Sequence, residues 1–280
     1  MDAKEKQLLT LLAERIRLAV IEGTYYAKSG HPGGSLSIAE DLAYLYWREM
    51  RIDHKDPQWP DRDRFVLSKG HAAPALYGAL ALRGYFPWET IFTLRHVGSI
   101  LQGHPDMKHI PGVDMSSGSL GQGISCAVGM ALAGKMDKKN YRVYTILGDG
   151  ELEEGQVWEA AMFAAAKKLD NLVVLVDNNN LQIDGTVEEV NSPYPIPEKF
   201  AAFGFHVVEI DGNDLEQIDR AFAEARTVKG KPTAIIQKTV KGKGVSYMEN
   251  QCGWHGAAPK REQYEIAVAE ITARIKELEG

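Results

Sequence analysis

The chain has 280 residues, 44% hydrophobic and 25% charged, which supplies ample apolar surface for a packed core and excludes a disordered chain. The formal net charge of -6 argues against nucleic-acid binding, which needs clustered Lys and Arg. No apolar stretch approaches the roughly 20 residues of a membrane span, and Cys126 and Cys252 suggest neither a disulfide framework nor a zinc site. We therefore expect a single domain over residues 1–280 in the reducing cytoplasm.

The first half of the chain alternates helices with glycine-rich loops. Apolar residues at near-helical spacing predict a helix over 5–28, which ends before the loop 30–34, and a second helix over 36–48. A short strand is expected at 64–68, before Gly70-His71 and a helix rich in Ala and Leu. The loop 116–123 then precedes a helix of small residues, which indicates close packing or close approach of the backbone to a ligand.

From residue 142 onward, apolar strands alternate with helical segments. Strands are expected at 142–150, 171–180, 206–210 and 232–239, with helices at about 153–169, 197–204, 215–228 and 260–278. Such alternation predicts an α/β fold, a mostly parallel sheet with helices on both faces. The one basic concentration, 229–244, is interpreted as a solvated strand edge and loop.

The strongest functional signal is Gly148-Asp149-Gly150 followed, after 27 intervening residues, by an Asn cluster that begins at Asn178. Each part follows an apolar strand, and the spacing fits one strand-helix-strand crossover, so the two loops should lie side by side. A lone Gly-Asp-Gly would be an ordinary turn. The pair at this spacing is much harder to explain as two turns, and it predicts a ligand site at the carboxyl ends of the strands.

The donors in this pair suit a hard divalent cation. Asp149 offers a carboxylate oxygen, the Asn cluster an amide oxygen, and a backbone carbonyl can add a third. Two diphosphate oxygens and a water would complete the octahedron that Mg²⁺ prefers. The backbone at Gly150 can approach a phosphate closely, and the helix expected from about Glu154 can add its N–H groups, so both are candidate cofactor contacts.

Over nearly its whole length the sequence resembles the transketolases, a family of thiamine-diphosphate enzymes. Residues 148–161, GDGELEEGQVWEAA, are similar to the opening of that family's cofactor motif, and 176–185, VDNNNLQIDG, to its close. The resemblance implies a thiamine-diphosphate-binding fold and transfer of a two-carbon ketol unit from a ketose to an aldose. It assigns the metal, Mg²⁺ or another cation such as Ca²⁺ or Mn²⁺, to Asp149, Asn179 and the carbonyl of Leu181.

Four of the eight histidines lie beside glycine, namely His31, His71, His104 and His255. Any one of them alone could be structural. Four in loops favour a site, because loops at strand ends gather functional residues. The resemblance implies that His31 and His104 face the ketose hydroxyls, and that His71 and His255 lie near the diphosphate and the reacting carbon. We expect all four to be catalytic, since neutral imidazoles can donate, accept and carry protons near pH 7.

The loop 117–123, SGSLGQG, resembles the family loop that runs along the cofactor. By this resemblance Gly118 lies against the aminopyrimidine side, whereas Leu120 and Ile183 pack on the thiazolium. Asn179, His71 and His255 are further cofactor contacts by the same match. A helix entry that needs glycine for its turn remains the alternative for Gly121 and Gly123.

The sequence also departs from the family. The Glu that activates the aminopyrimidine ring in transketolases, and the arginines that bind substrate phosphate, belong to later domains with no counterpart in residues 1–280. The resemblance therefore implies a split enzyme: a C-terminal subunit with the pyrimidine domain joins this chain in a two-plus-two heterotetramer that acts on sugar phosphates. Gly34-Ser35, Lys69, Ser119 and Trp254 also differ from the usual family residues, which leaves the identity of the sugars open.

Other functions compete with this interpretation. A 1-deoxyxylulose-5-phosphate synthase, or the alpha chain of a 2-oxo acid dehydrogenase, would use the same cofactor, but the loops of His31 and His104 favour transketolase. A non-catalytic cofactor-binding protein would not need those two histidines. A nicotinamide-binding fold would need G-x-G-x-x-G after the first strand with an acidic residue about 20 positions further on, an arrangement that is not present.

Overall fold

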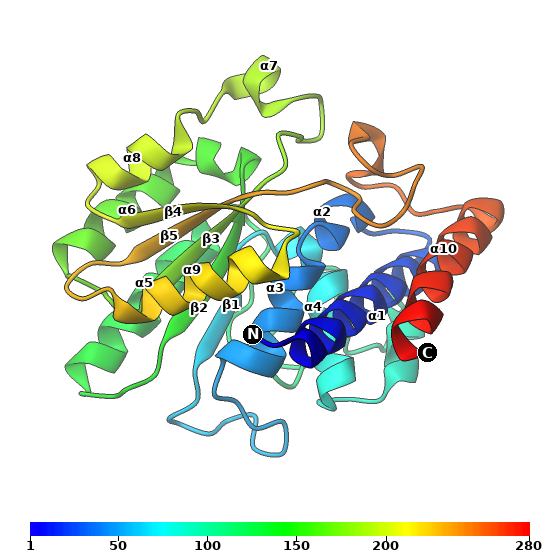
Figure 1. Ribbon diagram of the computed structural model, residues 1–280, viewed down its shortest axis with the longest axis horizontal. Helices are drawn as coiled ribbons and strands as arrows, with labels where there is room; N and C mark the ends of the chain where they lie inside the picture. Colours follow the sequence, from blue (N-terminus) through cyan, green and yellow to red (C-terminus); the bar gives the residue numbers. More distant parts are fainter.

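The computed structural model describes residues 1–280 and is organised around a five-stranded sheet in the order β1-β2-β3-β5-β4. Every pair of neighbouring strands is parallel. The strands are β1 Arg64–Leu67, β2 Val143–Gly148, β3 Leu172–Asn178, β4 His206–Asp211 and β5 Thr233–Lys238. Figure 1 shows the sheet with helices in front and behind, so the predicted α/β class is confirmed.

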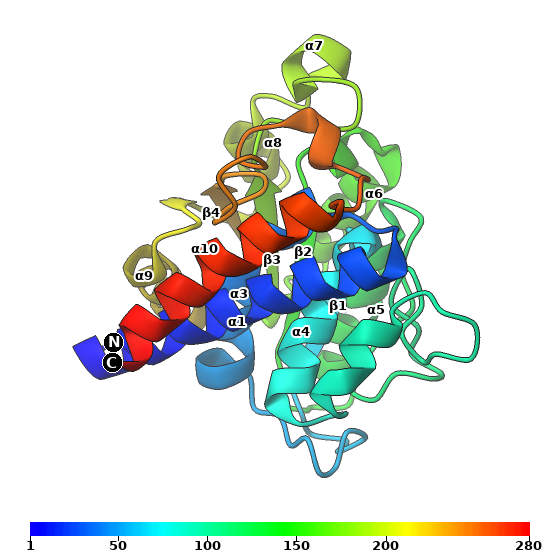
Figure 2. The same cartoon turned by 90° about the vertical axis from the view of Figure 1, so that its right-hand side faces the viewer.

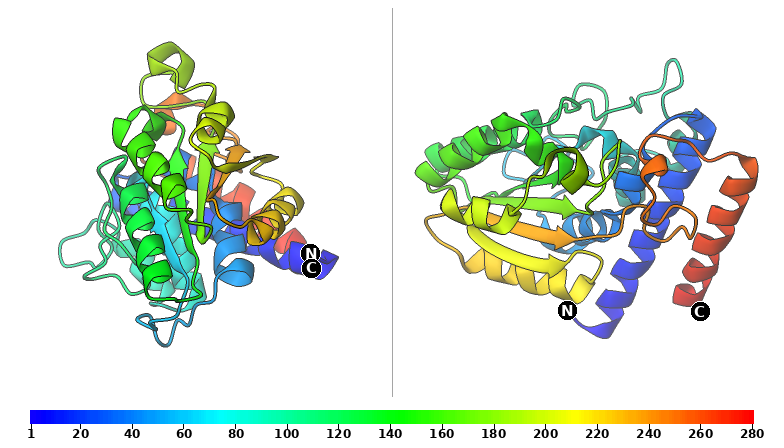
Figure 3. Two further views of the ribbon diagram at one scale, coloured as in Figure 1. Left: turned by 90° about the vertical axis from the view of Figure 1, so that its left-hand side faces the viewer. Right: turned by 90° about the horizontal axis from the view of Figure 1, so that it is seen from above.

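Helices fill both sides of the sheet. Their bounds are α1 Ala3–Ala27, α2 Pro32–Leu36, α3 Ala39–Tyr44, α4 Ala73–Arg83, α5 Gln122–Met136, α6 Gly155–Ala166, α7 Val187–Asn191, α8 Ile196–Ala202, α9 Leu215–Thr227 and α10 Arg261–Glu279. One layer contains α5, α6 and α8, and the other contains α1, α3, α4, α9 and α10. The left view of Figure 3 shows the two layers on opposite sides of the sheet. None of the helices combines the length and apolar character needed to cross a membrane.

The strands show why the sheet needs cover on both faces. In β3, Val173 and Leu175 pack into one core, while Val174 and Val176 pack into the other. All four are fully buried, because successive strand residues point to opposite faces and both faces carry helices. The continuous apolar run in the sequence has this physical origin.

The expected helix over 36–48 is wrong in detail. The chain forms the short helix α2, breaks at Ser37–Ile38, forms α3 and continues as a π-helical turn over Leu45–Glu49. The single hydroxyl proton of Ser37 is shared between the Asp177 carboxylate, at 2.7 Å, and the Gly34 carbonyl, at 3.1 Å. A serine side chain that bonds to nearby backbone competes with helix continuation, and the bond to Asp177 joins this break to the end of β3.

The long helix α1 carries the final helix α10 along its length, as Figure 2 shows. Arg17 is nearly fully buried and donates to Glu14, to Glu40 and to the Lys243 carbonyl. Arg274 on α10 donates to Glu14 and to the Gly244 carbonyl. Removing one partner of such a buried charged network typically costs about 3–5 kcal/mol. The network ties both helices to the segment that leads from β5 to His255.

Candidate functional site

The two motif loops lie beside each other at the carboxyl end of the sheet. Strands β2 and β3 are parallel neighbours, and Gly148 is in register with Asp177. Asp149 therefore faces the Asn cluster, and its Oδ2 accepts a hydrogen bond from the Asn180 N–H at 2.5 Å. The predicted convergence of the two motifs is confirmed.

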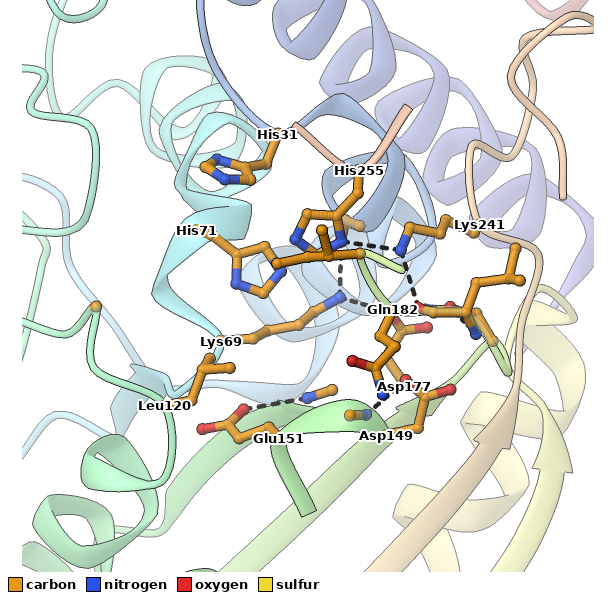
Figure 4. Close-up of a pocket in the computed structure, with 17 residues that line it drawn as sticks. His31, Lys69, His71, Leu120, Asp149, Glu151, Asp177, Gln182, Lys241 and His255 are labelled. Atoms are coloured by element: carbon orange, nitrogen blue, oxygen red, sulfur yellow. Dashed lines mark hydrogen bonds and ion pairs between the residues drawn. The ribbon is translucent and has the colours of Figure 1, made fainter. Parts of the chain in front are cut away.

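A cleft of ≈ 240 Å³ opens at this edge. Figure 4 shows three imidazoles gathered toward one end of it and carboxylates toward the other, with the Lys69 side chain between them. The lining residues are His31, Gly34, Lys69, His71, Gly118, Leu120, Gly148, Asp149, Gly150, Glu151, Asp177, Asn179, Leu181, Gln182, Ile183, Lys241 and His255. The structure thus collects most of the predicted site residues in one place.

The three expected metal donors all line the cleft. Asp149 contributes a carboxylate, Asn179 an amide, and Leu181 a backbone carbonyl. The Asn179 amide is oriented from both sides: its Oδ1 accepts from the Leu181 N–H at 3.1 Å and its Nδ2 donates to Asp177 at 3.0 Å. All the donors are hard oxygens, the type that Mg²⁺ and Ca²⁺ prefer.

The electrostatics of Asp149 also fit a cation. Burial raises the pKa of Asp149 to about 7, and the neighbouring Asp177 carboxylate contributes to that rise. Backbone N–H groups of Gly150 and Asn180 donate to the two Asp149 oxygens, but no side-chain cation is bonded to them. An ionised carboxylate in such a place is costly unless a positive charge neutralises it. A divalent ion would supply that charge, so the residues present fit the expected metal.

A buried ion pair supports the floor of the cleft. Lys69 is 2% exposed and Asp177 is fully buried, and the lysine Nζ lies 2.5 Å from the carboxylate. Burial opposes ionisation of Asp177, but the charge of Lys69 and hydrogen bonds from its neighbours keep its pKa below the usual range. Lys69 also donates to the Gly34 carbonyl at 2.7 Å. The pair therefore fixes the His31 loop against the end of β3.

The interpretation of segment 229–244 as a solvated strand edge and loop is wrong at Lys241. The composition of that segment predicts a solvated loop, yet Lys241 is buried, at 2% exposure. Its ammonium donates to the Leu181 carbonyl and to His255 Nδ1, both at 2.9 Å. Burial lowers the pKa of Lys241 to about 8, which leaves it mostly protonated at neutral pH. It places a positive charge beside the metal donors, where an anionic cofactor would need it.

Glu151 links loop 117–123 to the end of β2. Its buried carboxylate accepts from the Ser68 hydroxyl and from the backbone N–H groups of Gly121 and Gly148. Gly121 has a positive φ of 81°, a conformation that glycine adopts without strain. The turn aims the Gly121 N–H at Glu151 and starts α5, so the carboxylate holds loop 117–123 at the cleft wall.

The imidazoles form a neutral cluster. The ring centroid of His31 is 5.3 Å from that of His71 and 5.5 Å from that of His255. Burial lowers the pKa of His31 to about 4 and that of His255 to about 3, with help from neighbouring positive charges, and it lowers the pKa of His71 strongly. The ammonium of Lys241 can only donate, so His255 Nδ1 accepts and the ring proton is on Nε2. These rings can exchange hydrogen bonds with polyol hydroxyls at neutral pH.

Two predicted residues lie outside the cleft lining. The ring of His104 lies 6.3 Å from that of His31, between centroids, and it lies next to Gly118. Glu154 is exposed at the start of α6, near Gly121. Their assignments as a catalytic and a cofactor contact remain predictions.

Four lining residues were not singled out in the sequence, namely Glu151, Asp177, Gln182 and Lys241, whereas Lys69 entered only as a departure from the family pattern. Asp177 and Glu151 adjoin the recognised motifs, so their place at the strand ends was a usable signal. Lys241 gave no such signal, because the sequence does not reveal which lysine finds buried partners. Lys69 and Asp177, for instance, are separated by 108 positions.

Comparison with known proteins agrees with this geometry. Residues 9–273 match the family model described as transketolase, thiamine diphosphate binding domain. The chain is 50% identical over 259 residues to the 6-deoxy-6-sulfo-D-fructose transketolase subunit SqwG of Clostridium sp. (strain MSTE9), covering 92% of this chain and 94% of that protein. It is 46% identical over 273 residues to an apulose-4-phosphate transketolase subunit of Phocaeicola vulgatus, covering 98% of this chain and 97% of that protein.

A solved structure extends the comparison to the fold. Transketolase from Campylobacter jejuni superposes with a TM-score of 0.90 at 33% identity, over 97% of this chain. The match spans 43% of that longer protein, so the chain corresponds to less than half of it. The chain belongs to the transketolase family and corresponds to its thiamine diphosphate binding domain.

Proposed function

We propose that this chain is the cofactor-binding subunit of a split transketolase, which transfers a two-carbon ketol unit from a ketose to an aldose. The observation that carries the proposal is a single cleft with hard oxygen donors and Lys241 at one end and neutral imidazoles at the other. The two relatives named as transketolase subunits, at 50% and 46% identity, support transketolase-type chemistry.

In this proposal Asp149, Asn179 and Leu181 hold Mg²⁺ or a similar cation, and Lys241 and the backbone at Gly150 bind the diphosphate of thiamine diphosphate. Gly118, Leu120 and Ile183 contact its rings. When bound, the cofactor supplies a nucleophilic carbon and an electron sink for cleavage of the carbon–carbon bond. The protein's own contribution is to orient the sugar and to hold or move protons at its hydroxyls.

His31 is the residue best placed for that proton work. Its ring lies between His71, His255 and His104, and its Nδ1 is buried without a hydrogen-bond partner. A buried polar atom without a partner is costly, and a substrate hydroxyl would satisfy it. The lowered pKa of His31 keeps the ring neutral at pH 7, so its unprotonated nitrogen can accept a hydrogen bond from a substrate hydroxyl.

We expect His31→Ala to lower kcat by about 100- to 10,000-fold, the range for loss of a general acid or base. Affinity for thiamine diphosphate should change less than about threefold, because the metal donors and Lys241 are untouched. Steady-state kinetics and calorimetric titration separate the two quantities. His206→Ala, at the edge strand where His206 pairs with Glu224, is the matched control. Parallel losses in kcat and cofactor affinity would contradict the assignment.

The partner is a chain that supplies the pyrimidine domain, in a two-plus-two heterotetramer. Helices α5 and α6 both begin at the cleft, where Gln122 donates to Gln156. Their outer faces leave Met136 72%, Met162 60% and Phe163 42% exposed. Helices with apolar residues on their outer faces need cover, and a partner seated there would reach the cofactor. The two relatives named as subunits are each matched over more than nine-tenths of their length.

The substrates in this proposal are sugars with an anionic group. The two relatives are named for a sulfo-sugar and for a sugar phosphate. A cytoplasmic location is part of the same proposal, since both cysteines are free thiols.

The reaction class is tested with a ketose phosphate carrying ¹³C at C1 and C2. The assembled complex, supplied with an unlabelled aldose phosphate, should yield a product with both labels and an unlabelled shortened aldose, as mass spectrometry would detect. Turnover that instead requires a 2-oxo acid and releases carbon dioxide would identify a 1-deoxyxylulose-5-phosphate synthase-like enzyme and refute ketol transfer.

A further inference from the structure

Asp177, near the end of β3, contacts both residues whose side chains are proposed to hold the metal. Its backbone carbonyl accepts a hydrogen bond from the Asp149 N–H at 3.2 Å. Its carboxylate Oδ2 accepts another from Asn179 Nδ2 at 3.0 Å. Asp177 is fully buried and lies in register with Gly148 of the neighbouring strand. The two donor residues are therefore held from one fixed point in the sheet.

Hydrogen-bond donors surround the Asp177 carboxylate. Its Oδ2 also accepts from the Lys69 ammonium at 2.5 Å and from the Ser37 hydroxyl at 2.7 Å, and its Oδ1 accepts from the Thr239 hydroxyl. Lys69 is itself 2% exposed and supplies the counter-charge. A carboxylate paired with an ammonium can only accept hydrogen bonds. The part of the Asn179 amide that faces Asp177 must therefore be its donor end, the NH2 group.

This contact fixes the orientation of the Asn179 amide. With Nδ2 on Asp177, the amide oxygen Oδ1 accepts from the Leu181 N–H at 3.1 Å and keeps a second lone pair for a cation. Turned over, the amide would place its oxygen against the carboxylate and its NH2 group against the Leu181 N–H. Both contacts would then be repulsive. Because Mg²⁺ takes oxygen ligands, the orientation decides whether Asn179 can serve as a metal donor.

The two neighbouring asparagines lack this arrangement. Asn178 Oδ1 accepts from the Tyr194 hydroxyl at 2.6 Å, and Asn180 Oδ1 is buried without a hydrogen-bond partner. Neither residue lines the cleft that contains Asn179. Of three consecutive asparagines, the one whose amide is oriented by a carboxylate is therefore the proposed metal donor.

We propose that Asp177 is a positioning residue for the metal: it holds the Asn179 amide with its oxygen available to the cation, and Lys69 supplies the counter-charge that this buried carboxylate needs. Loss of a group that orients a metal ligand typically weakens metal binding 10- to 100-fold. The inference rests on the proposed function, because the cation belongs to that same site.

Lys69→Met combined with Asp177→Asn removes the ion pair, leaves neither charge buried alone and keeps the net charge. With saturating thiamine diphosphate, the double variant should bind Mn²⁺ about 10- to 100-fold more weakly than the wild type. When both proteins also carry Asn179→Asp, the same double change should alter Mn²⁺ affinity less than about threefold, because a carboxylate offers oxygen at both ends. Asn178→Asp in place of Asn179→Asp is the matched control and should keep the full loss. Electron paramagnetic resonance of free Mn²⁺ measures each constant.

A second measurement needs neither metal nor cofactor. In ¹⁵N magnetic resonance spectra of the full chain, the Asn179 NH2 signal, identified by its loss in Asn179→Asp, should be that of an ordered group, and removal of the ion pair should shift it. An altered signal in a chain that binds no Mn²⁺ would confirm the amide contact and refute the proposed metal site.

Three results would overturn the role of Asp177. The first is a wild-type Asn179 NH2 group that is mobile or unaffected by removal of the ion pair. The second is an equal loss of Mn²⁺ affinity with Asn and with Asp at position 179, which would assign Asp177 to the structure of the strand end. The third is unchanged Mn²⁺ affinity in the double variant.

Discussion

Asp149→Asn should weaken thiamine diphosphate binding in the presence of Mg²⁺ by about 100-fold or more. Changes to residues that merely support metal ligands typically cost 10- to 100-fold, and Asp149 is the only carboxylate among the three proposed donors. The variant keeps the size of the side chain and removes its charge. The measurement is calorimetric titration of the cofactor with saturating Mg²⁺, and again with a chelator.

The cofactor-free fold should tolerate this change. Burial raises the pKa of Asp149 to about 7, so ionisation of this carboxyl opposes folding of the empty site between its unfolded pKa and pH 7, and the uncharged amide removes that cost. The amide retains an acceptor for one of the two N–H groups that now bond to the carboxylate, at a cost of about 1–3 kcal/mol. That corresponds to a fall in Tm of only a few degrees for a chain of this size.

Asp184→Asn serves as the control, because Asp184 is exposed in the same loop region. It should bind the cofactor as the wild type does. Undiminished cofactor affinity in Asp149→Asn, or the same affinity with and without Mg²⁺, would refute the metal assignment. A large fall in Tm without cofactor would mean that Asp149 acts mainly in folding.

The sheet and its site edge were predictable because they follow from continuous apolar strands and crossover spacing. The sequence of β3 is an uninterrupted apolar run because both faces of the strand are buried. The rule for connections between parallel strands then predicted that Asp149 lies beside the Asn cluster. The break at Ser37 was not predicted, because many serines within helices bond to nearby backbone without ending the helix, and the second partner of Ser37, Asp177, lies 140 positions away.

Local sequence patterns did not predict which charged side chains are buried in the site. Lys241 belongs to a segment that resembles a solvated basic run, yet its partners Leu181 and His255 come from two different loops. Local composition records neither burial nor partners that are distant in sequence. The four site histidines were predicted because they lie beside glycines and match a family pattern.

Partner dependence is the other large expected effect. The proposal assigns the diphosphate and metal to this chain, and the activating carboxylate and much of the substrate site to a second chain. Half of a site can hold a cofactor without turning over substrate, because the protein must also orient and activate it. The exposed faces of α5 and α6, next to the cleft, are where the second chain should dock.

A substitution on the exposed face of α6 tests where the partner docks. Phe163→Glu places a charge in the apolar face of α6 and should weaken association with the partner by about 10-fold or more. Leu8→Glu changes a comparably exposed apolar residue on α1 and should leave association unchanged. Sedimentation of the mixed chains measures both.

Ketol transfer by each chain alone and by their mixture, with thiamine diphosphate and Mg²⁺ present throughout, tests the central claim most directly. The account predicts no measurable transfer by the 280-residue chain, none by its partner, and activity that rises to a plateau as the two approach equal amounts. Full activity from the 280-residue chain alone would contradict it.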